Sequence, residues 1–92
     1  MQIQLTDHAK HRMKQRCVPL AIIGWLLDFG EREKSGNCEV VYFNKKSKKL
    51  LAKEVGKEIV KSVSKYLNAF AVVGKKDQIV TTGYRNKHIY RA

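Results

Sequence analysis

One apolar run near the N-terminus limits what this chain can fold into more than any other feature. The segment Leu20–Phe29 carries one charged side chain, Asp28, and its apolar side chains cover a wide arc when the segment is helical. Even when the run is extended back to Val18 it is too short to span a bilayer, so it predicts a helix of the core. Pro19 suits the first helical turn and Gly30 the C-terminal cap. We therefore expect this helix to be the hydrophobic centre of the fold.

The composition indicates one small domain. The 92 residues are 43% hydrophobic, enough for one modest core, and no repeat, linker or low-complexity segment divides residues 1–92. The two cysteines, Cys17 and Cys38, are too few for a disulfide scaffold, and the polar N-terminus lacks the pattern of a signal peptide. These features predict a reduced, cytoplasmic protein.

The rest of the chain alternates between strand-like and helix-like spacing. Segments rich in β-branched residues or bounded by turn residues predict strands over residues 31–34, 38–43, 68–74 and 78–84. Residues 45–66 have helical spacing that Gly56 interrupts. With a helix before Pro19, the order is two helices, two strands, two short helices and two strands. This order predicts an α+β domain with helices packed on one face of a small antiparallel sheet.

The same patterns predict which side chains of these segments share a side. In the middle helices, the apolar side chains expected to be buried are Leu50, Leu51, Val55, Ile59, Val60, Val63 and Leu67. In the last strand, strict alternation places Ile79, Thr81, Gly83 and Arg85 on one side and Val80, Thr82 and Tyr84 on the other.

Residues 6–16 predict a first helix that begins at Thr6 or Asp7. The apolar side chains that share its core-facing side are Leu5, Ala9 and Met13. His8, Arg12 and Arg16 recur every four residues in or beside that side. Because burying unpaired charge costs several kcal/mol, we expect these three side chains to line a cleft over the core. The alternative is an amphipathic helix whose long arginines reach out to solvent.

The charge of the chain points to a polyanionic partner. Nineteen Lys and Arg against eight Asp and Glu give a net charge of +11, which nucleic acid fits most simply, although an anionic membrane or an acidic protein also fits. Candidate phosphate contacts are the stripe Lys57, Lys61 and Lys65 and the tail residues Lys87, His88 and Arg91. The alternative for the stripe is a solvated helix face.

The residue types available for chemistry favour RNA cleavage without a metal. The sequence contains no P-loop, nucleophile elbow, paired-carboxylate motif or metal cluster, so we expect no cofactor and no metal. His8 suits general acid–base chemistry on a ribose 2′-OH. Arg12, Arg16 and Arg85 suit binding of the phosphate and of the extra negative charge that develops on it.

Two segments resemble a known family. They are His8-Ala9-x-x-Arg12-Met13-x-x-Arg16, followed by a Pro-initiated helix that ends in Gly30, and a terminal strand that reads Ile79-Val80-Thr81-Thr82-Gly83-Tyr84-Arg85. This pattern is similar to a family of small, largely uncharacterised bacterial and archaeal domains that open on an H-A-x-x-R-M helix. That family is grouped with RelE-like toxins in the barnase/EndoU/colicin/RelE ribonuclease fold.

The resemblance implies a RelE-like fold with a site formed by His8, Arg12, Thr81 and Arg85, and Arg16 as an addition. Where the family often has histidine this chain has Tyr84, and His88 is the candidate replacement. We interpret the chain as a metal-independent endoribonuclease, the toxin of a toxin–antitoxin pair, with RNA, the ribosome and an acidic antitoxin as partners. The alternatives are a non-catalytic basic module that binds RNA or DNA, and a protein-interaction domain for an acidic partner.

Overall fold

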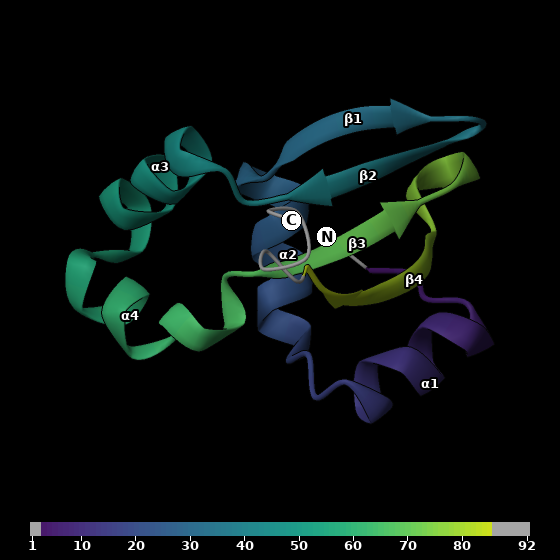
Figure 1. The fold of residues 1–92 in the computed structure, drawn as a ribbon, viewed down its shortest axis with the longest axis horizontal. Coiled ribbons are helices and arrows are strands. Elements are labelled where there is room, and N and C mark those ends of the chain that lie inside the picture. Colours follow the sequence, from purple (N-terminus) through teal and green to yellow (C-terminus); the bar gives the residue numbers. More distant parts are fainter. Residues whose placement is uncertain (1–2, 86–92) are drawn as a thin grey trace, which may run out of the picture.

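A computed structural model describes residues 3–85 as helices around a four-stranded antiparallel sheet in the order β1-β2-β3-β4 (Figure 1). The helices are α1 (Asp7–Gln15), α2 (Leu20–Phe29), α3 (Lys45–Val55) and α4 (Lys57–Ser62), with 3₁₀ turns at Ser64–Tyr66 and Lys75–Asp77. The strands are β1 (Glu31–Ser35), β2 (Cys38–Tyr42), β3 (Ala69–Val73) and β4 (Ile79–Tyr84). The predicted α+β class, the antiparallel sheet and the order of its elements are confirmed.

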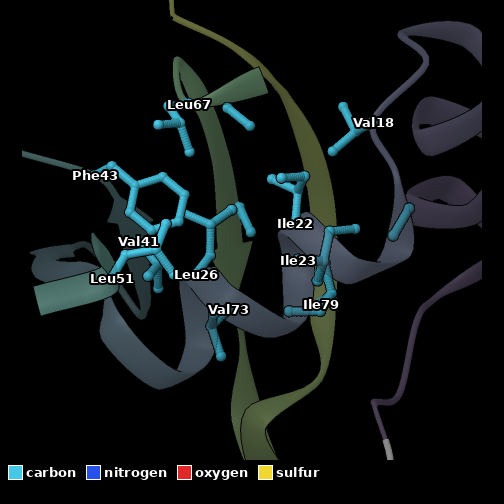
Figure 2. Packing of buried hydrophobic residues seen from close by; sticks show 13 residues of the cluster. Val18, Ile22, Ile23, Leu26, Val41, Phe43, Leu51, Leu67, Val73 and Ile79 are labelled. Carbon is cyan, nitrogen blue, oxygen red and sulfur yellow. The ribbon is translucent and has the colours of Figure 1, made fainter. Parts of the chain in front are cut away.

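Helix α2 crosses one face of the sheet and packs against β2 and β3 (Figure 1). Its side chains Ile22, Ile23 and Leu26 are buried, and Figure 2 shows them in one cluster with Val41 of β2 and Ile79 of β4. Burying an aliphatic side chain of this size stabilises a fold by about 1.5–3 kcal/mol. The expectation that this helix is the hydrophobic centre is confirmed.

Gly30 ends α2, as predicted, but the glycine is needed for space rather than for a left-handed backbone. Its φ of −69° is open to any residue, and its N–H donates to the Leu26 carbonyl at 2.8 Å. A Cβ at this position would lie 2.6 Å from the Leu26 oxygen and 2.8 Å from Cγ1 of Val41. The end of α2 therefore approaches β2 more closely than a side chain permits.

Helices α3 and α4 are separated at Gly56, which confirms the predicted interruption. Gly56 has a φ of +97°, in the region that favours glycine. Helix α3 begins with a capping box: the Ser47 N–H donates to the Asn44 side chain at 2.8 Å, and the Asn44 N–H donates to the Ser47 hydroxyl at 2.7 Å. The sequence thus fixes both ends of α3 by local hydrogen bonding and backbone conformation.

Two predicted core positions in these helices are exposed instead. Leu51 and Leu67 are buried, whereas Leu50 is 48% exposed and Ile59 is 45% exposed. The main contacts of α4 are with α3 and the 3₁₀ turn that follows it, at one end of the sheet (Figure 1). Helices in that position bury only the side that meets the core or the neighbouring helix. The predictions that Leu50 and Ile59 are buried are therefore wrong.

The pairing of β3 with β4 contains a register shift that sequence alternation misses. Val72 pairs with Thr81, but the next residue, Val73, pairs with Ile79, which leaves Val80 as the extra residue of a β-bulge. Ile79 is therefore buried in the core, while Thr81 lies on the opposite face. The prediction that Ile79 and Thr81 share a side is wrong because the bulge resets the alternation between them.

The face of the sheet opposite α2, which we call the second face, carries two rows of cross-strand neighbours. One row is Tyr42, Phe70 and Gly83, and the other is Val40, Val72 and Thr81. Among residues 3–85, no helix lies across this face (Figure 1). The second face is therefore where aromatic and polar side chains of three strands are accessible.

Gly24 within α2 and Gly30 at its C-terminal cap test the packing of this helix. Gly30→Ala should lower the free energy of unfolding by about 2–3 kcal/mol, because the added methyl group overpacks the contact with β2. Gly24→Ala is the matched control, since a Cβ there meets only Cδ1 of Ile3 at an ordinary 3.6 Å. It should raise stability by about 0.5–1 kcal/mol, the usual gain in a helix interior. Equal effects in urea unfolding would contradict the described packing.

Candidate functional site

The start of α1 is attached to β4. The Thr6 hydroxyl caps the helix by accepting from the Ala9 N–H at 3.1 Å, and it donates to the Val80 carbonyl at 3.1 Å. The backbone of the preceding residues also pairs with Ile79, whose carbonyl accepts from the Thr6 N–H at 3.0 Å and whose N–H donates to Gln4 at 2.8 Å. The first turn of α1 is therefore held at the β-bulge.

The end of α1 is attached to the same strand. Cys17, with a φ of +56°, ends the helix in a Schellman motif, in which the Val18 N–H donates to the Met13 carbonyl at 3.0 Å and the Cys17 N–H to the Lys14 carbonyl at 3.3 Å. The hydroxyl of Tyr84, in β4, donates to the Cys17 carbonyl at 2.8 Å. Attachments at both ends fix how the side chains of α1 lie relative to β4.

Tyr84 therefore has a structural role, because its hydroxyl joins β4 to the end of α1. Burial, followed by the nearby Tyr66 and Cys17 side chains, raises the pKa of Tyr84 above its ordinary value. The hydroxyl is protonated at neutral pH even at the ordinary tyrosine pKa of 10.0, so it can donate to the Cys17 carbonyl. Position 84 thus supplies a hydrogen-bond donor to the backbone.

A hollow of about 310 Å³, which we call the arginine hollow, lies between α1 and the sheet. Its lining residues are Arg12, Arg16, Phe70, Thr81, Thr82, Gly83 and Tyr84. Within residues 3–85, neither guanidinium forms an ion pair or a side-chain hydrogen bond. Two cations without a carboxylate partner make this hollow suited to an anion.

The two threonines of this hollow differ in what their hydroxyls do. Thr82 is 2% exposed, and its hydroxyl donates to the Phe70 carbonyl at 2.7 Å. Thr81, on the second face, is partly exposed, and no residue of the described range hydrogen-bonds its hydroxyl. Thr81 is thus the hydroxyl of this strand that is available to a ligand.

A neighbouring hollow of about 330 Å³, the tyrosine hollow, lies on the second face. Its lining residues are Glu33, Lys34, Ser35, Val40, Tyr42, Phe70 and Arg85. The guanidinium carbon of Arg85 lies 4.3 Å from the centroid of the Tyr42 ring, and the Tyr42 hydroxyl donates to Oε2 of Glu33 at 2.8 Å. That hydrogen bond is the first cause of the raised pKa of Tyr42, which Arg85 partly opposes.

Phe70 joins the two hollows because it lines both. It pairs across the strands with Gly83, and a Cβ at Gly83 would lie 3.2 Å from Cε1 of the Phe70 ring. Because Gly83 has no side chain, the Phe70 ring has room to extend over β4. The two hollows therefore form one continuous surface with an aromatic side chain between them.

The structure brings together some of the predicted site residues and leaves others apart. Arg12, Arg16 and Thr81 line one hollow, and Arg85 lines the next. His8 is exposed in the first turn of α1 and lines neither of these hollows. It lies one turn from Arg12 on the same side of the helix, a rise of about 6 Å. His8 is therefore beside the arginine hollow rather than in it.

The predicted lysine stripe is exposed but is not one helical stripe. Lys57 and Lys61 lie in α4, which ends at Ser62 because Val63 adopts φ −108° and ψ 14°. Lys65 lies in the 3₁₀ turn, with Nζ 5.1 Å from the centroid of the Tyr66 ring. The remaining predicted contacts, Lys87, His88 and Arg91, lie outside the described residues.

Three residues of this surface were missed by the sequence analysis: Glu33, Tyr42 and Phe70. They come from three different strands, so only the strand pairing brings them together. The turn at Ser35-Gly36-Asn37 was a usable signal for part of this, because a tight hairpin there sets Glu33 opposite Val40 and near Tyr42.

Residues 3–85 contain neither a cluster of metal ligands nor a membrane-spanning helix. No three His, Cys, Asp or Glu side chains of this range gather in a way that could hold a metal ion. None of the described helices is long and apolar enough to cross a membrane.

Comparison of the chain with family models, with curated proteins and with solved structures found no match in any of the three.

The attachment of α1 to β4 can be tested at Tyr84. Tyr84→Phe removes the hydroxyl that donates to Cys17 and should lower the free energy of unfolding by about 1 kcal/mol. Tyr66→Phe is the control, because its hydroxyl makes no hydrogen bond within residues 3–85, and it should have little effect. Thermal or urea unfolding of both variants measures the difference. Equal stability of the two variants would show that the Tyr84 bond does not hold α1.

Proposed function

We propose that this protein is a metal-independent endoribonuclease of RelE-like type, and that the arginine hollow binds the scissile phosphate of RNA. The observation that carries the proposal is the convergence of Arg12 and Arg16 from α1 with Thr81 from β4 in one hollow. No carboxylate of residues 3–85 pairs with either arginine. A phosphodiester supplies the negative charge and acceptor oxygens that such a hollow lacks.

The proposed reaction needs no metal. A base removes the proton of the ribose 2′-OH, and that oxygen attacks the adjacent phosphorus. The bond from phosphorus to the 5′ oxygen breaks as an acid protonates this oxygen, leaving a 2′,3′-cyclic phosphate and a 5′-OH. Guanidinium groups beside the phosphate stabilise the added negative charge of the transition state. Arg12 and Arg16 are assigned that role, and the Thr81 hydroxyl donates to a phosphate oxygen.

His8 is the acid–base group of this proposal. Its position one turn before Arg12 leaves it exposed at the rim of the arginine hollow, where RNA bound there would pass. An imidazole can both accept and donate a proton, which suits this side chain to acid–base chemistry. Arg85, stacked on Tyr42 in the adjoining hollow, contributes charge along the path of the chain.

A second candidate function is binding of RNA without cleavage. The observation that favours it is that neither hollow is lined by an imidazole within residues 3–85. The aromatic and cationic side chains Tyr42, Phe70 and Arg85 would still bind single-stranded RNA through stacking and charge. Cleavage assays separate this function from the first.

The positive charge of the chain supports two kinds of partner. A net charge of +11 supports RNA as the ligand, free or on the ribosome, in the cytoplasm. It also supports an acidic antitoxin protein, which would meet the exposed lysines of α3 and α4. These are Lys45, Lys46, Lys49, Lys53, Lys57 and Lys61.

The catalytic proposal is tested by cleavage of RNA with single variants. Arg12→Ala, Arg16→Ala and His8→Ala should each lower the rate at least about tenfold, because each removes a charge-stabilising or proton-transferring group. Lys10→Ala, an exposed change on the same helix, is the control and should leave the rate within about twofold. Cleavage should persist in EDTA and leave 2′,3′-cyclic phosphate ends. Loss of cleavage on chelation would contradict the mechanism, and binding without cleavage would favour the second candidate.

The lysines of α4 are tested by the salt dependence of RNA binding. Changing Lys57, Lys61 and Lys65 together to Gln should weaken binding and reduce the slope of log K against log salt by about 2, if each lysine contacts a phosphate. Changing Lys75 and Lys76 to Gln, at the opposite end of the fold, is the control (Figure 1). An unchanged slope in the first variant would identify these lysines as a solvated surface.

A further inference from the structure

We propose that the tyrosine hollow is a nucleobase subsite that selects guanine in single-stranded RNA. The inference rests on the proposed function in one respect, that RNA is the ligand, and it does not require cleavage. It assigns a binding role to Glu33, Tyr42 and Phe70, which the cleavage reaction does not use.

The hollow offers planar groups on which a base can stack. Tyr42 and Phe70 are direct cross-strand neighbours on the second face, and both are partly exposed. The Arg85 guanidinium lies over the Tyr42 ring, 4.3 Å from its centroid, so the flat surface that a base meets there is the positively charged guanidinium plane, with the Phe70 ring beside it. Stacking on aromatic rings and on arginine planes is how proteins hold unpaired RNA bases. Such a platform accepts any base, so it supplies affinity but not selection.

Selection comes from the carboxylate at the rim of the platform. The Tyr42 hydroxyl donates to Oε2 of Glu33 at 2.8 Å, which fixes the carboxylate beside the rings. No residue in the range 3–85 hydrogen-bonds or pairs with Oε1 of Glu33. A carboxylate oxygen has more than one acceptor position, so both oxygens can still accept from a ligand. The hollow therefore presents a fixed acceptor pair to the edge of a stacked base.

Guanine is the base whose edge complements a carboxylate. It carries two adjacent donors, N1–H and the N2 amino group, which can bond both carboxylate oxygens. Adenine and cytosine present one amino donor beside a ring-nitrogen acceptor, and uracil presents one N–H between two carbonyl groups, so each of them places an acceptor against the negative charge. A bidentate pair with a base typically gives about tenfold or greater discrimination.

The subsite also has a defined relation to the proposed phosphate site. Because Phe70 lines both hollows, a base in the tyrosine hollow has its sugar and phosphate at the edge of the arginine hollow. Arg12 and Arg16 would then contact the phosphate of that nucleotide or of its neighbour. The two hollows together would recognise a guanine and the phosphodiester next to it.

The test is equilibrium binding to short 2′-O-methyl RNAs, which cannot undergo 2′-OH attack. Four uridine-based oligonucleotides differ at one central position, which is guanine, inosine, adenine or cytosine. The guanine oligonucleotide should bind at least about tenfold more tightly than the adenine one, with inosine, which lacks the N2 amino group, between them. Glu33→Gln should reduce this preference to about twofold or less, because its amide opposes a donor to the base. Glu58→Gln, which removes an exposed carboxylate of α4 outside this hollow, is the charge-matched control and should keep the preference.

The outcomes separate this inference from the proposed function. Equal binding of the four oligonucleotides, a preference retained in Glu33→Gln, or an equal loss in Glu58→Gln would overturn the guanine subsite while leaving an RNA-binding protein. No binding to any of them at low salt would overturn both proposals. Guanine preference in a protein that cuts no RNA would support the subsite and reject the endoribonuclease.

Discussion

The packing of α2 against β2 and β3 is the contact on which the rest of this structure depends. A chain of 92 residues has apolar material for one modest core, and α2 places Ile22, Ile23 and Leu26 in that core against side chains of the sheet. With α2 on one face, the sheet is left with a second face that no helix of residues 3–85 crosses. That face carries Tyr42, Phe70 and Thr81, side chains that suit a ligand better than a core. Because the chain forms one core on one face of the sheet, the other face stays accessible, and the candidate site lies there.

The second requirement is that α1 be held at the edge of this face. The Thr6 hydroxyl attaches the start of α1 to the Val80 carbonyl of β4, and the Tyr84 hydroxyl of β4 donates to the Cys17 carbonyl at the end of α1. After the β-bulge at Val80, Thr81 lines the same hollow as Arg12 and Arg16. The fold thus holds the backbone positions of Arg12 and Arg16 beside Thr81. The same attachments explain why a tyrosine at position 84 serves the fold rather than the chemistry.

The sequence predicted the parts of this structure that depend on local patterns. The apolar run marked α2, and Gly56 marked the break between α3 and α4. The four-residue spacing of His8, Arg12 and Arg16 predicted a shared cleft, which the two arginines line and His8 does not. Features that depend on tertiary pairing were missed. The bulge moved Ile79 into the core, and the tyrosine hollow combines Glu33, Tyr42 and Phe70 from three strands whose full register no local pattern specifies. The exposure of Leu50 and Ile59 likewise depends on where α3 and α4 dock, not on their spacing.

The central claim, that a phosphodiester binds where α1 meets β4, is tested most directly by NMR titration of the labelled protein with an uncleavable 2′-O-methyl RNA. The account predicts that the largest amide shifts fall on Arg12, Arg16, Phe70 and the segment 81–83, which line or border the arginine hollow. Shifts confined to the lysine-bearing helices α3 and α4, with the α1–β4 junction unchanged, would contradict it.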